Sequence, residues 1–164
     1  MKPMNELDQK ILNASLPLTA TIANPSRENI EKALAGLTQL WKDLSASVVQ
    51  NRMDTGSFND VLAMVEQGEL FKSMIINLTE TLQNNNMHEE LVDFTKEILD
   101  HVKFNEPSEL EFKHALKKAA LLAIDECQGT SAAAEFFKTW RKEEPGSGYA
   151  SGSWITLLKK HEQY

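Results

Sequence analysis

The chain has a single cysteine, Cys127, among its 164 residues, so it cannot close an internal disulfide. Disulfides belong mainly to oxidising compartments, and this one thiol therefore favours a reducing, cytoplasmic setting. The sequence also lacks the uninterrupted apolar run of roughly 18 residues that a membrane span requires. Residues 1–10 lack the apolar region of a signal peptide. We expect a soluble, cytoplasmic protein.

Glycine and proline are scarce, with 7 and 5 residues, and they fall mostly between stretches of helical pattern. No stretch shows a convincing strand pattern, and no repeat period is evident. At 164 residues, of which 41% are hydrophobic, the chain is large enough for one domain that buries roughly 70% of its unfolded surface. We predict an all-α fold, a single-domain irregular helical bundle of six to eight helices.

Apolar residues recur at spacings of three and four, which predicts separate amphipathic helices. Pro17 is expected to end the first helix, and Asn86 to cap the helix over 87–104. Asp54, Thr55 and Gly56 are expected to form a turn. The predicted helices cover residues 4–16, 26–49, 57–67, 70–82, 87–104, 108–128 and 131–144, with a last one from 153.

The stretch 108–128 is the predicted central helix. Ser108 and Glu111 have the S-x-x-E spacing of a capping box, and Gly129 is a helix stop. The 87–104 helix should pack against it antiparallel, because the connection between them is short.

Apolar residues cover most of the surface of this central helix. Only a narrow polar arc interrupts them, formed by His114, Lys118 and Asp125. Such a pattern is typical of a helix that is surrounded by others. We expect Leu122 to be enclosed in its middle.

The composition changes at residues 145–152 (PGSGYASG), the one Gly/Ser-rich segment of the chain. Its glycines superficially resemble a phosphate-binding loop, but no strand precedes them and no Lys-Ser/Thr follows. We predict a helical bundle over 1–144, a linker over 145–152, and a C-terminal helix over 153–164 that packs on the same domain. In this last helix, Ser153 is the expected cap, with Leu157 and Leu158 pointing inward.

The net charge of −7 is concentrated in the middle of the chain, where residues 53–111 carry thirteen Asp/Glu against three Lys/Arg. An acidic surface repels phosphate backbones and anionic lipids. Nucleic acid and membranes are therefore poor partners, and a protein with a basic surface is the better expectation. At about 100° per residue, five acids share the outer face of the 87–104 helix. They are Glu89, Glu90, Asp93, Glu97 and Asp100.

Three short patterns could indicate a catalytic or metal-binding site, but a structural role explains each of them better. Residues 54–57 (DTGS) match a string of aspartic proteases but do not follow a strand. Glu111 and His114 have the E-x-x-H spacing of diiron bundles, which need a second such pair that the chain lacks. Cys127 lies on an apolar helix side, where burial raises the thiol pKa. We predict no catalytic residues, no metal site and no cofactor.

These observations favour a non-enzymatic protein–protein interaction module, such as an adaptor, an inhibitor or an immunity-type binder, whose acidic helix face engages a basic partner. The alternative is a small all-α enzyme or ligand-binding protein with a site between helices. A deep pocket that gathers His114, Glu111 or Asp125 would favour the alternative.

Overall fold

The computed structural model describes residues 6–50, 62, 65–101, 107–146 and 148–162. These residues form seven α-helices and no strand, which confirms the all-α prediction. None of these helices is long and apolar enough to cross a membrane. The predicted turn at 54–56 and most of the helix expected after Ser57 lie outside the described residues. The helices are α1 (Glu6–Ala23), α2 (Arg27–Gln50), α4 (Gly68–Asn84), α5 (His88–His101), α6 (Pro107–Gln128), α7 (Thr130–Glu143) and α8 (Gly148–Glu162).

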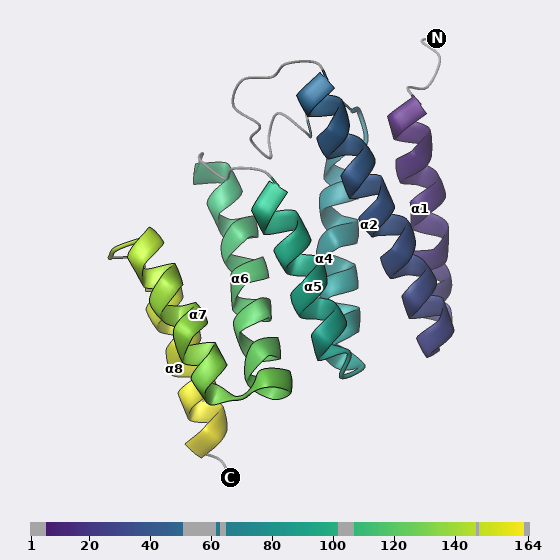
Figure 1. Cartoon of the computed structure of the whole chain (residues 1–164). Coiled ribbons are helices and arrows are strands. Elements are labelled where there is room, and N and C mark those ends of the chain that lie inside the picture. Colours follow the sequence, from purple (N-terminus) through teal and green to yellow (C-terminus); the bar gives the residue numbers. More distant parts are fainter. Residues whose placement is uncertain (1–5, 51–61, 63–64, 102–106, 147, 163–164) are drawn as a thin grey trace.

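The helices form an irregular antiparallel bundle that extends sideways, with α1 and α2 at one end and α7 and α8 at the other (Figure 1). α6 lies between the two ends and packs against α4, α5, α7 and α8. α5 and α6 run antiparallel side by side, as their short connection predicts.

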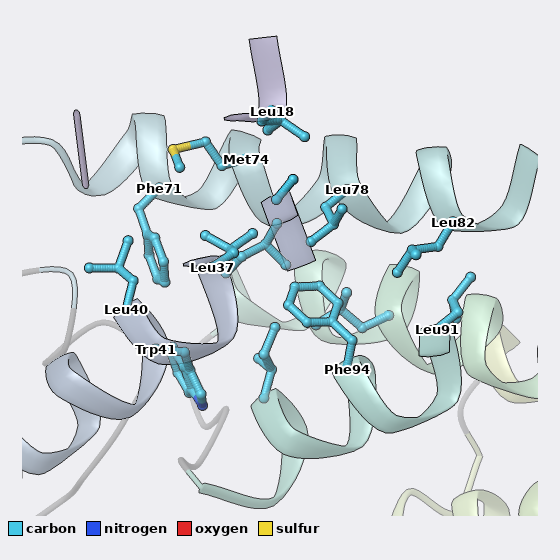
Figure 2. Close-up of a cluster of buried hydrophobic side chains, with 14 of the residues drawn as sticks. Leu18, Leu37, Leu40, Trp41, Phe71, Met74, Leu78, Leu82, Leu91 and Phe94 are labelled. Atoms are coloured by element: carbon cyan, nitrogen blue, oxygen red, sulfur yellow. The ribbon is translucent and has the colours of Figure 1, made fainter. Parts of the chain in front are cut away.

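Two hydrophobic cores meet at α6. The larger core is built by α1, α2, α4 and α5, and Figure 2 shows its aromatic and aliphatic side chains interdigitating. The smaller core joins α6 to α7 and α8 through Leu121, Ile124, Ala133 and Leu157. α6 contributes Phe112, Leu116, Ala119 and Ala123 to the larger core. The prediction of a buried central helix is therefore confirmed.

The position of Leu122 differs from the prediction. Leu122 is only half-buried, whereas its neighbour Leu121 is fully buried. One residue turns a helix by about 100°. That step places Leu122 at the edge of the smaller core, where it packs against the buried residues and also lines a cavity.

α1 continues through Pro17 to Ala23, so the prediction that Pro17 ends it was wrong. Pro17 has no amide to donate to the carbonyl four residues before it, which destabilises the helix locally. Tertiary packing overrides this cost, because Leu18 lies in the larger core and Thr21 is buried beyond it. The Thr21 Oγ1 hydroxyl donates to the Pro17 carbonyl at 2.9 Å.

Asn86 ends α4 rather than capping α5. Its φ of 57° is left-handed, which asparagine tolerates better than most residues. The Met87 amide donates to the Leu82 carbonyl and the Asn86 amide to the Gln83 carbonyl, the hydrogen-bond pattern of a Schellman motif. Met87 and Leu82 are both buried in the larger core, which adds the hydrophobic contact typical of that motif.

Two helices begin earlier than predicted. α6 begins at Pro107, one residue before the expected Ser108 cap, because proline suits the first helical turn. α8 begins at Gly148, so most of the predicted 145–152 linker is helical. Ala150 and Ser153 are buried there, and this packing outweighs the low helix propensity of the segment. Leu158, expected inward, is 41% exposed.

Asp8 joins α1 to the start of α4. Its side chain is buried, and Oδ1 accepts hydrogen bonds from the backbone amides of Glu66 and Gln67, each at 2.9 Å. Gln67 directly precedes α4 and has no side-chain cap of its own. Asp8 therefore supplies from another helix an acceptor that a local capping residue usually provides.

Candidate functional site

The outer face of α5 carries three exposed carboxylates. Leu91, Phe94 and Ile98 lie in the larger core and fix the orientation of the helix. Its opposite side therefore faces solvent, with three acids and one lysine. These are Glu89, Asp93, Lys96 and Asp100. None of the three acids forms an ion pair with a described residue.

The other two acids of the predicted face lie toward α2 and are half-buried. Glu90 Oε1 accepts a hydrogen bond from Arg27 Nη2 at 2.9 Å. At Glu97, the backbone carbonyl accepts the Trp41 indole N–H at 3.3 Å. Three of the five predicted acids are therefore exposed, whereas Glu90 and Glu97 are half-buried at the edge of this face, and Glu90 is already partly neutralised within the fold.

The negative charge of this face reaches the end of α6. The pKa of the Cys127 thiol is raised, first by burial and then by the nearby charges of Glu89 and Asp93. This agrees with the raised thiol pKa expected from the sequence. A thiol held in its protonated form is a weak nucleophile.

A groove of about 540 Å³ lies beside this face, between α5, α6 and α7, in the volume range of small-molecule sites. Its apolar lining comes from all three helices, namely Val92, Leu99, Ala120, Ile124, Phe136 and Trp140. Charged side chains also line it, namely Lys96, Asp100, Lys113, Lys117 and Glu143. Lys117 is buried and pairs with Glu143 at 3.0 Å.

His114, which was predicted to lie on a narrow polar arc of α6, is buried in a polar network. Its Nε2 bonds to Glu144 Oε1 at 2.8 Å, and its ring stacks on Tyr149 with centroids 4.3 Å apart. The indole N–H of Trp140 donates to the other Glu144 oxygen at 2.7 Å. Glu111, the other residue of the E-x-x-H pattern, is exposed.

Glu144 is the centre of this network and is ionised. Burial alone would raise the pKa of its carboxyl group. The hydrogen bond from His114 and the charges of Lys113, His114 and Lys117 outweigh burial and lower that pKa to about 2. Because an ionised carboxylate only accepts hydrogen bonds, the proton of this bond is on His114 Nε2. The network fastens α6 to the corner between α7 and α8.

The third residue of the predicted polar arc, Asp125, is also buried. Its carboxylate accepts from Thr130 Oγ1 at 2.9 Å and bonds to His161 Nε2 at 2.8 Å. A hydroxyl, an imidazole and a carboxylate together resemble a nucleophilic triad. In such a triad, however, the two histidine nitrogens bind different partners. Here Nε2 faces both Asp125 and Thr130, and the trio ties α7 and α8 to the end of α6.

Neither the groove nor the other cavity described below gathers His114, Glu111 or Asp125. Within the described ranges, no three His, Cys, Asp or Glu side chains are arranged to hold a metal ion. No sequence pattern indicated that Glu144 is the centre of a network, because a glutamate before Pro145 indicates only the end of a helix. The DTGS string at 54–57 lies outside the described residues.

No family model matches the chain, and comparison with curated proteins and with solved structures gives no match.

Proposed function

We propose that the protein is a non-enzymatic protein–protein interaction module that uses the outer face of α5 to engage a basic surface on a partner protein. The observation that carries the proposal is the set of exposed carboxylates of Glu89, Asp93 and Asp100, which form no ion pair with a described residue. Glu90 and Glu97 lie at the edge of the same surface. An adaptor, an inhibitor or an immunity-type binder fits this description.

The charges on this face have an energetic cost that a partner would offset. Glu89 and Asp93 are four residues apart on one helix side, and so are Asp93 and Glu97. Like charges at this spacing repel by about 0.2–0.5 kcal/mol per pair. A basic surface would relieve that repulsion and would accelerate association by electrostatic steering. We propose the cytoplasm as the compartment, since the lone Cys127 closes no internal disulfide.

The test reverses charge on this face. The wild-type protein is first used to capture a partner from native lysate. The rate at which this partner associates is then measured with the wild-type protein and with the Asp93→Lys/Asp100→Lys variant. We expect the variant to keep its fold and associate at least about tenfold more slowly at low salt. Raising the salt concentration should slow wild-type association, because the Debye length falls from about 10 Å at 0.1 M to about 3 Å at 1 M.

A matched control reverses two exposed acids elsewhere, with Glu80→Lys on α4 and Glu111→Lys on α6. This variant has the same net charge as the test variant. If both variants slow association equally, only net charge matters and the α5 face is not the docking surface. Rates that are equal for all three proteins and insensitive to salt would contradict the proposal.

The groove between α5, α6 and α7 supports a second candidate, a small ligand-binding protein or enzyme. Its apolar lining together with Lys113 and Lys117 would suit an amphipathic ligand. A ligand there would shift the NMR signal of the Trp140 indole N–H, which lies at the groove and bonds to Glu144. A metabolite pool that shifts this signal and leaves the signals of Glu89 and Asp93, which do not line the groove, unchanged would favour this candidate over the interaction module.

A further inference from the structure

A second cavity of about 550 Å³ lies on another side of α6, where the α4–α5 corner faces α8. We call it the corner pocket. Ala119 and Ala123 line it one turn apart on α6, and their small side chains leave room between the helices. Its volume is within the range of small-molecule sites, about 300–1,000 Å³.

The charged groups of the corner pocket are mostly cationic, in contrast to the acidic chain as a whole. Lys159 and Lys160 reach it from α8, and Glu126 is its one acid among the described residues. Glu126 is already paired with Lys160. Lys159 is exposed and has no ion-pair partner in the described part of the chain. One positive charge is therefore left without a carboxylate.

A buried nitrogen adds a second observation. His88, the first residue of α5, lines the pocket, and its Nδ1 is buried with no hydrogen-bond partner among the described residues. Buried polar atoms in proteins nearly always have such a partner. Gln83, Asn86 and Thr156 bring further polar groups to the same cavity.

From this arrangement we infer that the corner pocket binds a small organic anion, whose carboxylate or phosphate group is held by Lys159 and His88 and whose body rests on Ala119 and Ala123. The unpaired charge of Lys159 favours an anion over a cation. A charge-assisted hydrogen bond from the lysine is the strongest contact that the pocket offers. The binding site is separate from the α5 face and does not depend on the proposed docking function.

The experiment titrates the full chain with two probes, inorganic phosphate and citrate, at constant ionic strength, and follows NMR shifts. We expect saturable shifts at the amides of Ala119, Ala123 and Thr156 and at the His88 ring nitrogens. Lys159→Gln removes the unpaired charge at an exposed position and should weaken binding about tenfold or more. Lys142→Gln removes one charge from exposed α7, outside the pocket, and should leave binding unchanged.

The two probes separate the possible sources of the anion. Saturation by phosphate alone assigns a phosphate ester, saturation by citrate alone assigns a carboxylate, and saturation by both supports the shared chemistry. His88→Gln provides a second variant, which should weaken binding without altering the shifts of α1 and α2. Shifts that do not saturate at the pocket, or that are the same in Lys159→Gln and wild type, would overturn the inference.

Discussion

Asp8 stabilises the start of α4 from a position in α1. Two backbone amides, those of Glu66 and Gln67, depend on one buried carboxylate oxygen. Removing it leaves both donors without that acceptor, and hydrogen bonds to charged groups contribute about 1.5–3 kcal/mol each.

Asp8→Ala is therefore expected to lower the free energy of unfolding by about 3–6 kcal/mol, measured by urea denaturation. Asp8→Asn keeps an acceptor oxygen but loses its charge, and it should cost about half as much. Glu6→Ala, an exposed change in the same helix, serves as the control. A loss in Asp8→Ala no larger than in the control would show that the two bonds contribute nothing.

Glu144 makes stability depend on pH in a defined window. Its pKa is lowered from the ordinary value of 4.5 to about 2 in the folded protein. A lowered folded-state pKa contributes stability that is present above the unfolded value and is lost as pH falls through the folded one. At about 1.4 kcal/mol per unit, this contribution amounts to about 3–4 kcal/mol.

The comparison is wild type against Glu144→Gln, with unfolding free energies measured between pH 7 and pH 2. We expect the difference to be constant above about pH 5, to shrink below about pH 4.5, and to vanish near pH 2. A difference that is the same at every pH would mean that the charge of Glu144 does not stabilise the fold.

Along α6, two neighbouring leucines differ in burial. Leu121 is fully buried in the smaller core, whereas Leu122 lines the corner pocket. Leu121→Ala should cost about 2–5 kcal/mol, as expected for a cavity in a packed core. Leu122→Ala should lower the free energy of unfolding by less than half of that amount, because Leu122 already lines a cavity that is open to solvent. Chemical denaturation measures the free energy of unfolding of both variants. A larger decrease for Leu122→Ala than for Leu121→Ala would contradict this prediction.

Periodicity in the sequence predicted the existence of the helices but not all of their ends. Apolar spacing identifies a buried side, and α2, α4, α5 and α7 were found from it with small shifts at their boundaries. Pro17, Asn86 and Gly148 were misread because proline, asparagine and glycine indicate local preference, which tertiary packing overrode in α1 and α8. For Asn86, the choice between ending one helix and starting the next depended on a backbone dihedral angle that no residue pattern fixes.

The candidate site was predictable only in part. The acidic side of α5 follows from helical spacing, since Leu91, Phe94 and Ile98 fix which side is buried. The pairing of Glu90 with Arg27, 63 residues away, depends on how α2 and α5 pack. The networks around Glu144 and Asp125 also join helices that are distant in sequence. Single-sequence periodicity contains no information about such contacts.

The two hydrophobic cores of the bundle differ in size. The core around α7 and α8 has four buried residues in the described chain, and the larger core has several times that number. Regions with few buried apolar contacts open at lower free energy than the rest of a protein.

Native-state hydrogen exchange is expected to show weaker protection for amides of α7 and α8 than for those of α2, α4 and α5. Glu144→Gln should weaken protection further in α7 and α8 alone, because its network joins them to α6. Uniform protection across all helices would show that the two cores open together.

The hydrogen bonds of Asp8 also affect the kinetics of folding and unfolding. They join residues 58 and 59 positions apart, and contacts across so long a loop carry a high closure entropy. Such contacts tend to form after the folding transition state. Asp8→Ala should then leave the folding rate nearly unchanged and speed unfolding, about tenfold for each 1.4 kcal/mol lost. One carboxylate in α1 would thus determine how long each native molecule lasts rather than how quickly it forms.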